Sequence, residues 1–222
     1  MSVRFGCRST HAAVAAVWML GCSAAESPPR NAGAAVATME PGAVACAPGD
    51  TALFPTAALQ EREGWYGKHL RAAGEGRLCA RANVDEAYRF TWLRTFAPPV
   101  VVRVERLRDG YTLTAKQLDG AGGYEPGRLV VNRTVPLGPA EWRRMHVLLD
   151  SAGLWSPAPP REDASPGLDG ARWILEGVRG SEYRAVDRWS PTETGPDRHI
   201  RATGLYLLQV AGLTPRDPRQ IY

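Results

Sequence analysis

Charged residues gather in two blocks near the end of the chain, LDGARWILEG and YRAVDRWSP. Two carboxylates held in different environments can act as general acid and general base in hydrolysis, and arginines beside them can hold a ligand. The catalytic candidates are Glu176, Asp187 and Asp169. The ligand-binding candidates are Arg172 and Arg188 in these blocks and Tyr124 in an earlier loop.

The spacing of the two blocks decides which of these residues meet. If the turn between two strands falls at Arg179-Gly180, Arg172 opposes Asp187 across the hairpin. Glu176 then lies further along the same face, beside Tyr183. The alternative to a catalytic or ligand-binding site is a cross-strand ion pair with partly solvated neighbours.

The loop that contains Tyr124 reads DGAGGYEPG and begins at Asp119. It lacks the GxGxxG spacing of dinucleotide-binding loops, and it joins two predicted strands where such a loop would open a helix. We expect its glycines to adopt positive φ angles in a tight connection. Tyr124 and Glu125 could still rim a binding surface, because loops often carry function.

Other kinds of chemistry find less support in the sequence. His69, His146 and His199 fall on three different predicted helices, and no GxSxG motif accompanies them. Since the chain has no CxxC pair and its histidines are scattered, we predict neither a metal site nor a cofactor. Most tryptophans fall on faces predicted to be buried, so we expect core packing and not a carbohydrate-stacking set.

Helices and strands must position these residues. We expect helices at 56–73, 138–153 and 196–212, and strands at 87–95, 100–107, 111–118, 128–135, 171–177 and 182–189. Tyr88, Phe90 and Trp92 alternate with Arg89 and Thr91, which predicts a half-buried strand. The fold class is therefore α+β: one antiparallel sheet, made of a four-strand meander plus a hairpin, with about three helices on one of its faces.

Local features refine these elements. We expect one side of the first helix to be a buried stripe of side chains. We expect a glycine in the last helix to allow close packing of that helix. An Asp-Gly pair predicts a hairpin turn between two strands. The residues concerned are Leu59, Tyr66, Leu70 and Ala73 in the stripe, Gly204 in the last helix, and Asp109-Gly110 at the turn.

The first 21 residues predict secretion. Arg4 and Arg8 precede the apolar run AAVAAVWML, which is too short to span a bilayer. The following residues, MLGC, resemble the bacterial lipobox, in which the cysteine is diacylated and becomes the new N-terminus. Cys22 is therefore the predicted lipid-attachment residue. The alternative is ordinary signal-peptidase cleavage after Ala24 or Ala25.

The residue after the lipobox cysteine bears on location. In that system a residue other than Asp favours the outer membrane, and this chain has Ser23. We expect an outer-membrane lipoprotein that faces the periplasm, or alternatively a soluble periplasmic or secreted protein. Residues 22–49 are rich in Ala, Gly and Pro and predict a tether, followed by one folded domain at 50–222.

The cysteines divide by position. Cys7 leaves with the leader, and Cys22 is assigned to lipid. Cys46 and Cys79 remain as an even pair in an oxidising compartment. We predict a disulfide bond that ties the end of the tether to the loop after the first helix. Two unpaired thiols are the alternative.

The charge pattern bears on partners. Half of the formal net charge of +4 comes from Arg4 and Arg8 in the leader, and the other arginines are interspersed with acidic residues. Because nucleic-acid binding usually needs a clustered basic face, we do not expect a nucleic-acid partner. The expected partners are a membrane, through the lipid anchor, and an envelope protein or wall component.

Four blocks, YRFTWLRTF, LDGAGGYEPG, DGARWILEG and VDRWSP, resemble a family of uncharacterised bacterial secreted or lipoprotein-like proteins. The likeness spans most of residues 60–213. It implies one coherent domain and brings no activity, ligand or catalytic residue.

Three functions therefore stay open. The first is a non-enzymatic binding module of the cell envelope that holds a protein or a wall or membrane component. The second is a carboxylate-dependent hydrolase of an envelope or wall substrate. The third is a structural envelope protein without a specific ligand.

Overall fold

The computed structural model describes residues 44–46, 52–80, 84–156 and 169–222. The predicted leader, Cys22 and residues 22–43 and 47–49 of the predicted tether lie outside these residues. The chain divides into two units, Met1–Ala34 and Ala35–Tyr222, and every described residue belongs to the second.

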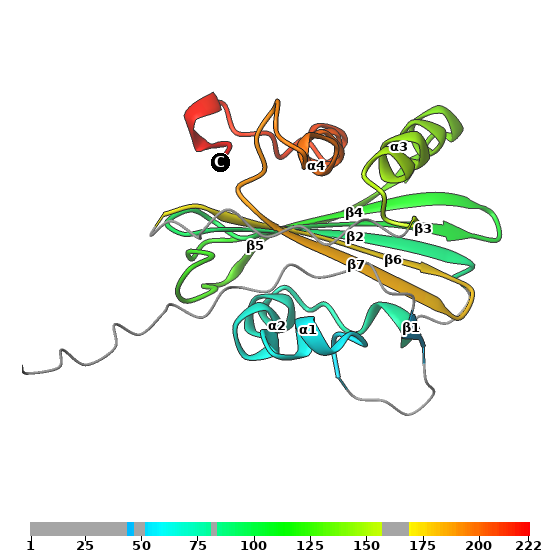
Figure 1. The fold of residues 1–222 in the computed structure, drawn as a ribbon, viewed down its shortest axis with the longest axis horizontal. Helices are drawn as coiled ribbons and strands as arrows, with labels where there is room; N and C mark the ends of the chain where they lie inside the picture. Colours follow the sequence, from blue (N-terminus) through cyan, green and yellow to red (C-terminus); the bar gives the residue numbers. More distant parts are fainter. Residues whose placement is uncertain (1–43, 47–51, 81–83, 157–168) are drawn as a thin grey trace, which may run out of the picture. The chain divides into compact units, whose positions relative to one another are not determined.

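In the described part of the chain, seven strands form one antiparallel sheet in the order β1-β7-β6-β2-β3-β4-β5 (Figure 1). The strands are β1 (Val44–Ala45), β2 (Glu86–Arg94), β3 (Val100–Leu107), β4 (Gly110–Leu118), β5 (Leu129–Leu137), β6 (Ala171–Arg179) and β7 (Glu182–Trp189). The predicted meander of β2 to β5 and the predicted hairpin of β6 and β7 are both confirmed. The hairpin lies beside β2, which makes β2 the central strand.

Two boundaries differ from the predictions. The two-residue strand β1 pairs with β7 and belongs to the range predicted as tether, so the sheet includes residues before Asp50. The turn between β3 and β4 lies at Arg108 and Asp109, one residue earlier than predicted, because Leu107 pairs with Gly110. Gly110 adopts a φ of 143°, which favours glycine at the first position of β4.

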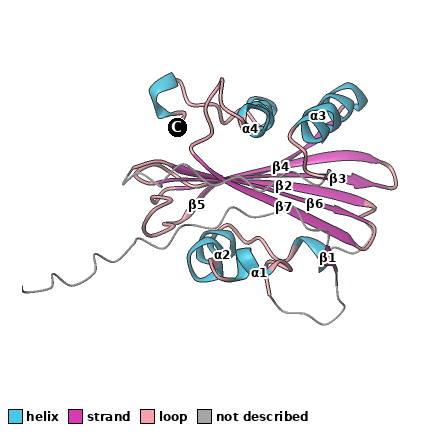
Figure 2. Cartoon of the chain, viewed as in Figure 1, coloured by secondary structure: helices cyan, strands magenta, loops and turns pink. Residues whose placement is uncertain are grey.

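Helices cover both faces of the sheet, so the prediction that they gather on one face is wrong (Figure 2). The helices α1 (Ala57–Gln60) and α2 (Glu63–Ala72) lie on one face, and α3 (Pro139–Ser151) and α4 (Arg198–Val210) lie on the other. The strand β2 is consequently buried along its whole length and is not half-buried. Its polar residues Arg89 and Thr91 indicated a solvent-facing side, but both are covered by the α1–α2 layer.

The first predicted helix is two helices, because the chain turns at Glu61 and Arg62. The predicted buried stripe is confirmed: Leu59, Tyr66 and Leu70 are fully buried in the core under α1 and α2. Leu78 of the short 3-10 helix η1 (Leu78–Ala80) also belongs to this core.

The face under α3 and α4 carries an aromatic core. Phe90, Trp92 and Trp173 are fully buried there, and the ring centroids of the two tryptophans are 5.2 Å apart. The predicted close packing at Gly204 is confirmed, because a Cβ atom added there would lie 2.6 Å from Trp173 and 2.7 Å from Phe90. The absent side chain therefore sets how closely α4 approaches the sheet.

Candidate functional site

The turn of the β6–β7 hairpin lies at Gly180 and Ser181, and Ile174 is the residue that pairs with Asp187. The prediction that Arg172 directly opposes Asp187 is therefore wrong. Because the register differs by two residues, each side chain keeps its predicted face. Arg172 reaches Asp187 diagonally, with an Nη1–Oδ1 distance of 3.6 Å.

Asp187 is buried against α2, with 2% of its surface exposed. Its Oδ2 accepts hydrogen bonds from the Tyr66 hydroxyl at 2.8 Å and from Arg62 Nη1 at 3.0 Å. Burial raises the pKa of Tyr66, and the nearby Asp187 carboxylate raises it further. The Asp187 carboxylate is thus held between two arginines and a neutral tyrosine.

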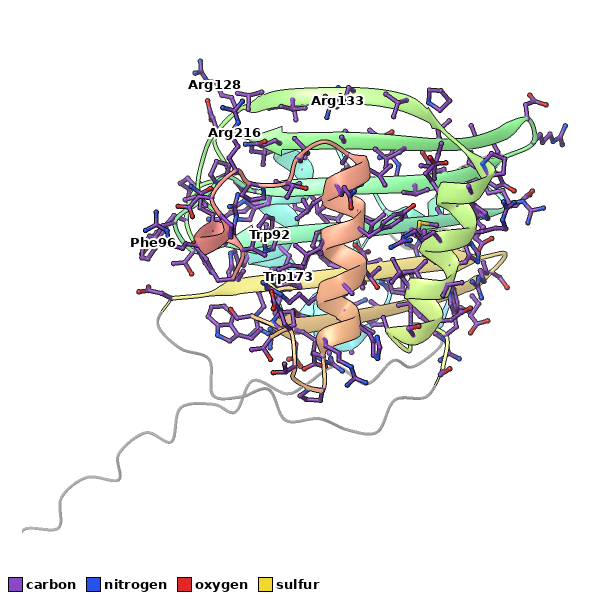
Figure 3. The ribbon with its side chains drawn as sticks, turned by 90° about the horizontal axis from the view of Figure 1, so that it is seen from above. Trp92, Phe96, Arg128, Arg133, Trp173 and Arg216 are labelled. Carbon is purple, nitrogen blue, oxygen red and sulfur yellow. A yellow bond between two sulfur atoms is a disulfide. The ribbon has the colours of Figure 1, made fainter. Side chains whose placement is uncertain are left out.

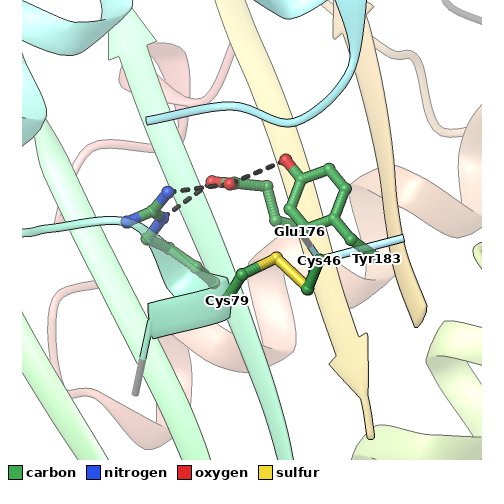
Figure 4. Close-up of a disulfide and its surroundings, with 5 residues drawn as sticks. Cys46, Cys79, Glu176 and Tyr183 are labelled. Atoms are coloured by element: carbon green, nitrogen blue, oxygen red, sulfur yellow. Dashed lines mark hydrogen bonds and ion pairs between the residues drawn. A yellow bond between two sulfur atoms is a disulfide. The ribbon is translucent and has the colours of Figure 1, made fainter. Parts of the chain in front are cut away.

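Glu176 is fully buried on the same face and pairs with Arg89 of the central strand (Figure 4). Arg89 Nε and Nη2 each donate to a Glu176 carboxylate oxygen at 2.7 Å, a bidentate pair of the strong kind. The Tyr183 hydroxyl donates to the same carboxylate at 2.9 Å. Arg89 Nη1 also donates to the Gly76 carbonyl at 2.7 Å, which ties the loop after α2 to the sheet.

Glu75 in this loop extends the ion pairs across the sheet. Its carboxylate contacts Arg103, Lys116 and Arg89, with 2.8 Å to Lys116 Nζ. Burial acts to raise the pKa of Glu75, but Arg103 and Arg89 together hold the pKa below its usual value. We call the six residues of this group the buried ion network; they are Glu75, Arg89, Arg103, Glu105, Lys116 and Glu176.

The predicted catalytic carboxylates do not form an open acid–base site. Glu176 and Asp187 share a face, but both are buried under the first helical layer, and each already contacts at least one arginine and a tyrosine hydroxyl. Asp169 is exposed just before β6. The alternative, a cross-strand ion pair with partly solvated neighbours, is closer to the structure, since Arg172 contacts Asp187, and both residues are buried.

The remaining ligand-binding candidates lie elsewhere. Arg188 is on the opposite face from Asp187, and its Nε donates to Asp197 Oδ1 at 3.0 Å, at the N-cap of α4. Tyr124 is 56% exposed and stacks on Phe96, with ring centroids 5.8 Å apart. The structure therefore does not bring Arg172, Arg188 and Tyr124 into one site.

The predicted disulfide bond is confirmed: Cys46 and Cys79 are bonded, with their Cα atoms 5.5 Å apart (Figure 4). Cys46 directly follows β1, and Cys79 lies in η1 after α2. The bond fixes the edge of the sheet to the loop that carries Glu75. The disulfide bond lies close to Glu176, a member of the buried ion network, and to Tyr183, which donates to Glu176.

The three histidines lie on α2, α3 and α4, as predicted. His69 is fully buried, and burial lowers its pKa to about 4, with Lys68 adding to the effect. His146 Nε2 lies 3.2 Å from Glu86 Oε1, and burial lowers the pKa of His146 more than Glu86 raises it. Both imidazoles are therefore neutral near pH 7.

A groove runs between α3 and α4 on the solvent side of these helices. Two neighbouring cavities of about 450 Å³ each share the lining residues Arg144, Tyr206 and Gln209. The Arg144 guanidinium lies 5.5 Å from the centre of the Tyr206 ring, and the Tyr206 hydroxyl donates to the Glu141 carbonyl at 3.1 Å. We call this surface the helical groove. One of its cavities is also lined by Ile221.

The helical groove adjoins a cluster of hydrogen-bond donors that bind the last residues of the chain. Trp173 Nε1 donates to the Tyr222 main-chain oxygen at 3.0 Å, and Trp92 Nε1 donates to it at 3.4 Å. Arg94 Nη1 donates to Gln220 O and Arg201 Nη2 donates to Ile221 O, each at 3.3 Å. Figure 3 shows Trp92 and Trp173 next to each other on the sheet beside α4.

We call these four donors the carbonyl site; they are Trp92, Arg94, Trp173 and Arg201. Sequence reasoning assigned the tryptophans to the core and did not single out the arginines. The available signal was the indole nitrogen, because a buried tryptophan usually needs an acceptor for its N–H group. The identity of that acceptor depends on how a distant segment returns to the sheet.

Within the described residues, no group of three or more His, Cys, Asp or Glu side chains is placed to hold a metal ion. In the same residues, no helix has the length and apolar character to cross a membrane. No protein-family model matches the chain, and no match is found among curated proteins.

Proposed function

We propose that the protein is a non-enzymatic binding module of the cell envelope, anchored by acyl chains on Cys22 and facing the periplasm from the outer membrane. The helical groove carries this proposal. In one of its cavities, apolar side chains such as Leu148, Leu205 and Ile221 lie beside the polar Arg144 and Gln209, and such a mixture is usual in a binding site. The proposed ligand is an envelope protein or wall component that docks on α3 and α4.

The arrangement of the carboxylates favours binding over hydrolysis. A general acid or base must reach the reacting atoms. Glu176 and Asp187 are buried beneath α1 and α2 and are engaged by arginines, so a substrate would have to displace a helical layer to reach them. A structural envelope protein without a ligand is the remaining alternative, and it assigns no role to the helical groove.

The proposed location has two supports. The leader and lipobox of residues 1–22 indicate export, and the Cys46–Cys79 disulfide suits the oxidising conditions outside the cytoplasm. The proposed membership in a family of secreted or lipoprotein-like proteins agrees with this location. Two acyl chains are enough to hold a domain stably on a membrane.

A cross-linking pull-down of the full-length protein from its own envelope tests the proposal. We expect the wild-type chain to recover a specific protein or wall fragment, and Arg144→Glu in the helical groove to lower recovery by about tenfold. Arg71→Glu is the matched control, because Arg71 is an exposed arginine of α2 on the other face of the sheet. Equal recovery by the two variants would contradict the proposal.

The protein recovered in the pull-down also tests whether Cys22 carries the lipid anchor. Intact mass should show two or more acyl chains on the mature chain that begins at Cys22, and Cys22→Ala should abolish them. A mature chain that begins after Ala24 or Ala25 without lipid would contradict lipidation and leave the binding proposal standing.

A further inference from the structure

The carbonyl site is built only from donors. Tryptophan offers one N–H group and arginine five, and neither side chain has an acceptor. Three main-chain oxygens of consecutive residues, Gln220, Ile221 and Tyr222, meet these donors one after another. Such a site recognises the main-chain oxygens of a peptide, a mode that gives affinity without requiring particular side chains.

The donors are held in place independently of the segment that they bind. Trp173 packs against Phe90 and Trp92 with centroid distances of 5.5 and 5.2 Å. The Arg94 guanidinium lies 4.0 Å from the centre of the Trp92 ring, and that of Arg201 lies 5.6 Å from the centre of the Trp173 ring. The donors therefore keep their positions when the segment leaves, as a preorganised binding site requires.

Two further donors at the site are unused by the bound segment. Among the described residues, neither Arg94 Nε nor Arg201 Nε has a hydrogen-bond partner, although both atoms are buried. A buried donor without an acceptor costs free energy, so an additional acceptor from a ligand would be favourable there. The chain's own segment leaves this capacity unfilled.

The segment that occupies the site is held by few other interactions. Residues 218–220 form the short 3-10 helix η2 (Pro218–Gln220), which has no buried residue, and the segment pairs with no strand of the described sheet. Ile221 and Tyr222 are only partly buried against the aromatic core. Figure 3 shows this segment, in red, next to Trp92 at one end of the sheet, the end that also carries the exposed Phe96.

We propose that the carbonyl site binds a peptide segment of a partner protein through its main-chain oxygens, and that residues 218–222 occupy the site in cis until the partner displaces them. This inference rests on the proposed function, because it names the chemistry of the partner on the α3–α4 side. The helical groove continues the site, since Ile221 lines one of its cavities. A partner segment in the carbonyl site would thus extend along α3 and α4.

The test is a titration in trans. A variant that ends at Leu213 leaves the carbonyl site open, and the nonapeptide TPRDPRQIY supplies residues 214–222. We expect saturable one-to-one binding by calorimetry, and binding at least about tenfold weaker to the full-length chain, whose own segment competes. A peptide that lacks the last two residues, and therefore the oxygens bound by Trp92, Trp173 and Arg201, should not bind measurably.

Substitutions in the truncated chain localise the binding. Trp173→Phe removes one N–H donor and keeps a ring, and we expect it to weaken binding about tenfold. Trp142→Phe is the matched control, because Trp142 is buried on the same face and its indole donates no hydrogen bond within the described residues. No saturable binding to a truncated chain with native circular dichroism, or equal affinity of the two variants, would overturn the proposal.

A second measurement covers the case in which the truncated chain does not fold. In the full-length protein, amides of residues 219–222 should exchange with solvent about tenfold faster in Trp173→Phe than in Trp142→Phe. Equal exchange rates would overturn the proposal. Because both experiments use purified protein, they can fail while the envelope pull-down succeeds, which would leave the proposed function standing without this site.

Discussion

The face of the sheet under α1 and α2 combines an apolar core with buried ion pairs that reach the loop after α2, whereas aromatic rings dominate the core under α3 and α4. On the first face Arg89 binds Glu176 at 2.7 Å and contacts Glu75. On the second, Trp173 packs against Phe90 and lies under Gly204. The same central strand, β2, contributes alternate residues to both arrangements.

The two faces differ in what their buried side chains can do. A buried ion pair adds little net stability, but removing one partner is costly, so each member is needed once the others are present. Aromatic side chains stabilise through buried area and can also direct N–H groups toward a ligand. We therefore infer that the charged face holds α2 and its loop in place, and we propose that the aromatic face is the binding face.

The largest effect is expected from breaking the buried ion network. Glu176→Ala leaves the Arg89 guanidinium buried without its carboxylate and should lower the free energy of unfolding by about 3–5 kcal/mol. Urea unfolding followed by circular dichroism measures this change. Glu125→Ala, which removes the exposed pair with Lys68, should change it by less than about 1 kcal/mol. A loss below about 1 kcal/mol for Glu176→Ala would show that the network does not hold this face.

The disulfide bond should have the next largest effect. It closes a loop with a sequence separation of 33 residues, and the double substitution Cys46→Ala/Cys79→Ala should lower the free energy of unfolding by about 2–4 kcal/mol. Reductant should destabilise the wild type to the same extent and leave the double variant unchanged. If reductant changes both proteins equally, the bond is not the source of the effect.

On the aromatic face, Gly204→Ala should lower the free energy of unfolding by about 1–3 kcal/mol, since the added methyl group meets Trp173 at 2.6 Å. Gly64→Ala in α2 is the control, because no atom lies within 4 Å of its added Cβ atom. This change should be neutral or stabilising by up to about 1 kcal/mol, as expected from helix propensity. Similar destabilisation by both changes would contradict close packing of α4.

The smallest expected effect is the change of stability with pH, through His69 on α2. His69 has its pKa lowered to about 4, so the unfolded chain binds more protons than the folded chain between pH 6.5 and about 4. Stability should therefore fall by about 1–2 kcal/mol from pH 7 to pH 5. The contribution of Glu75, whose pKa is below its ordinary 4.5, is still present at pH 5 and is lost only at lower pH.

His69→Gln tests this assignment. The variant should show a flatter dependence of the urea midpoint on pH between 7 and 5 than the wild type. An unchanged slope in His69→Gln would assign the pH dependence to another group.

Much of the fold could be predicted from local sequence pattern. Period-two alternation located β2, and β-branched residues located β3, because both signals come from residues next to each other in the chain. The placement of helices on both faces could not be predicted in the same way. Arg89 and Thr91 look solvent-facing in the sequence, and their burial depends on Glu75 and Glu176, which are distant in the chain.

The candidate sites show the same limit. A one-residue shift of the β6–β7 turn changed the register by two residues and the partner of Asp187 from Arg172 to Ile174, although the shared face of Arg172 and Asp187 was predicted. The carbonyl site was not predicted, because it joins β2, β6 and α4 to residues 220–222. Its acceptors are main-chain oxygens, which have no sequence signature.

Site-specific photo-cross-linking in the native envelope tests most directly whether the α3–α4 side is the binding side. A photoreactive residue replaces either Gln209, which is exposed and lines both cavities of the helical groove, or Glu61, which is exposed beside α1 on the other face. We predict a discrete cross-linked species from position 209 and none from position 61. A species from position 61 alone would contradict the account and move the binding surface to the charged side of the sheet.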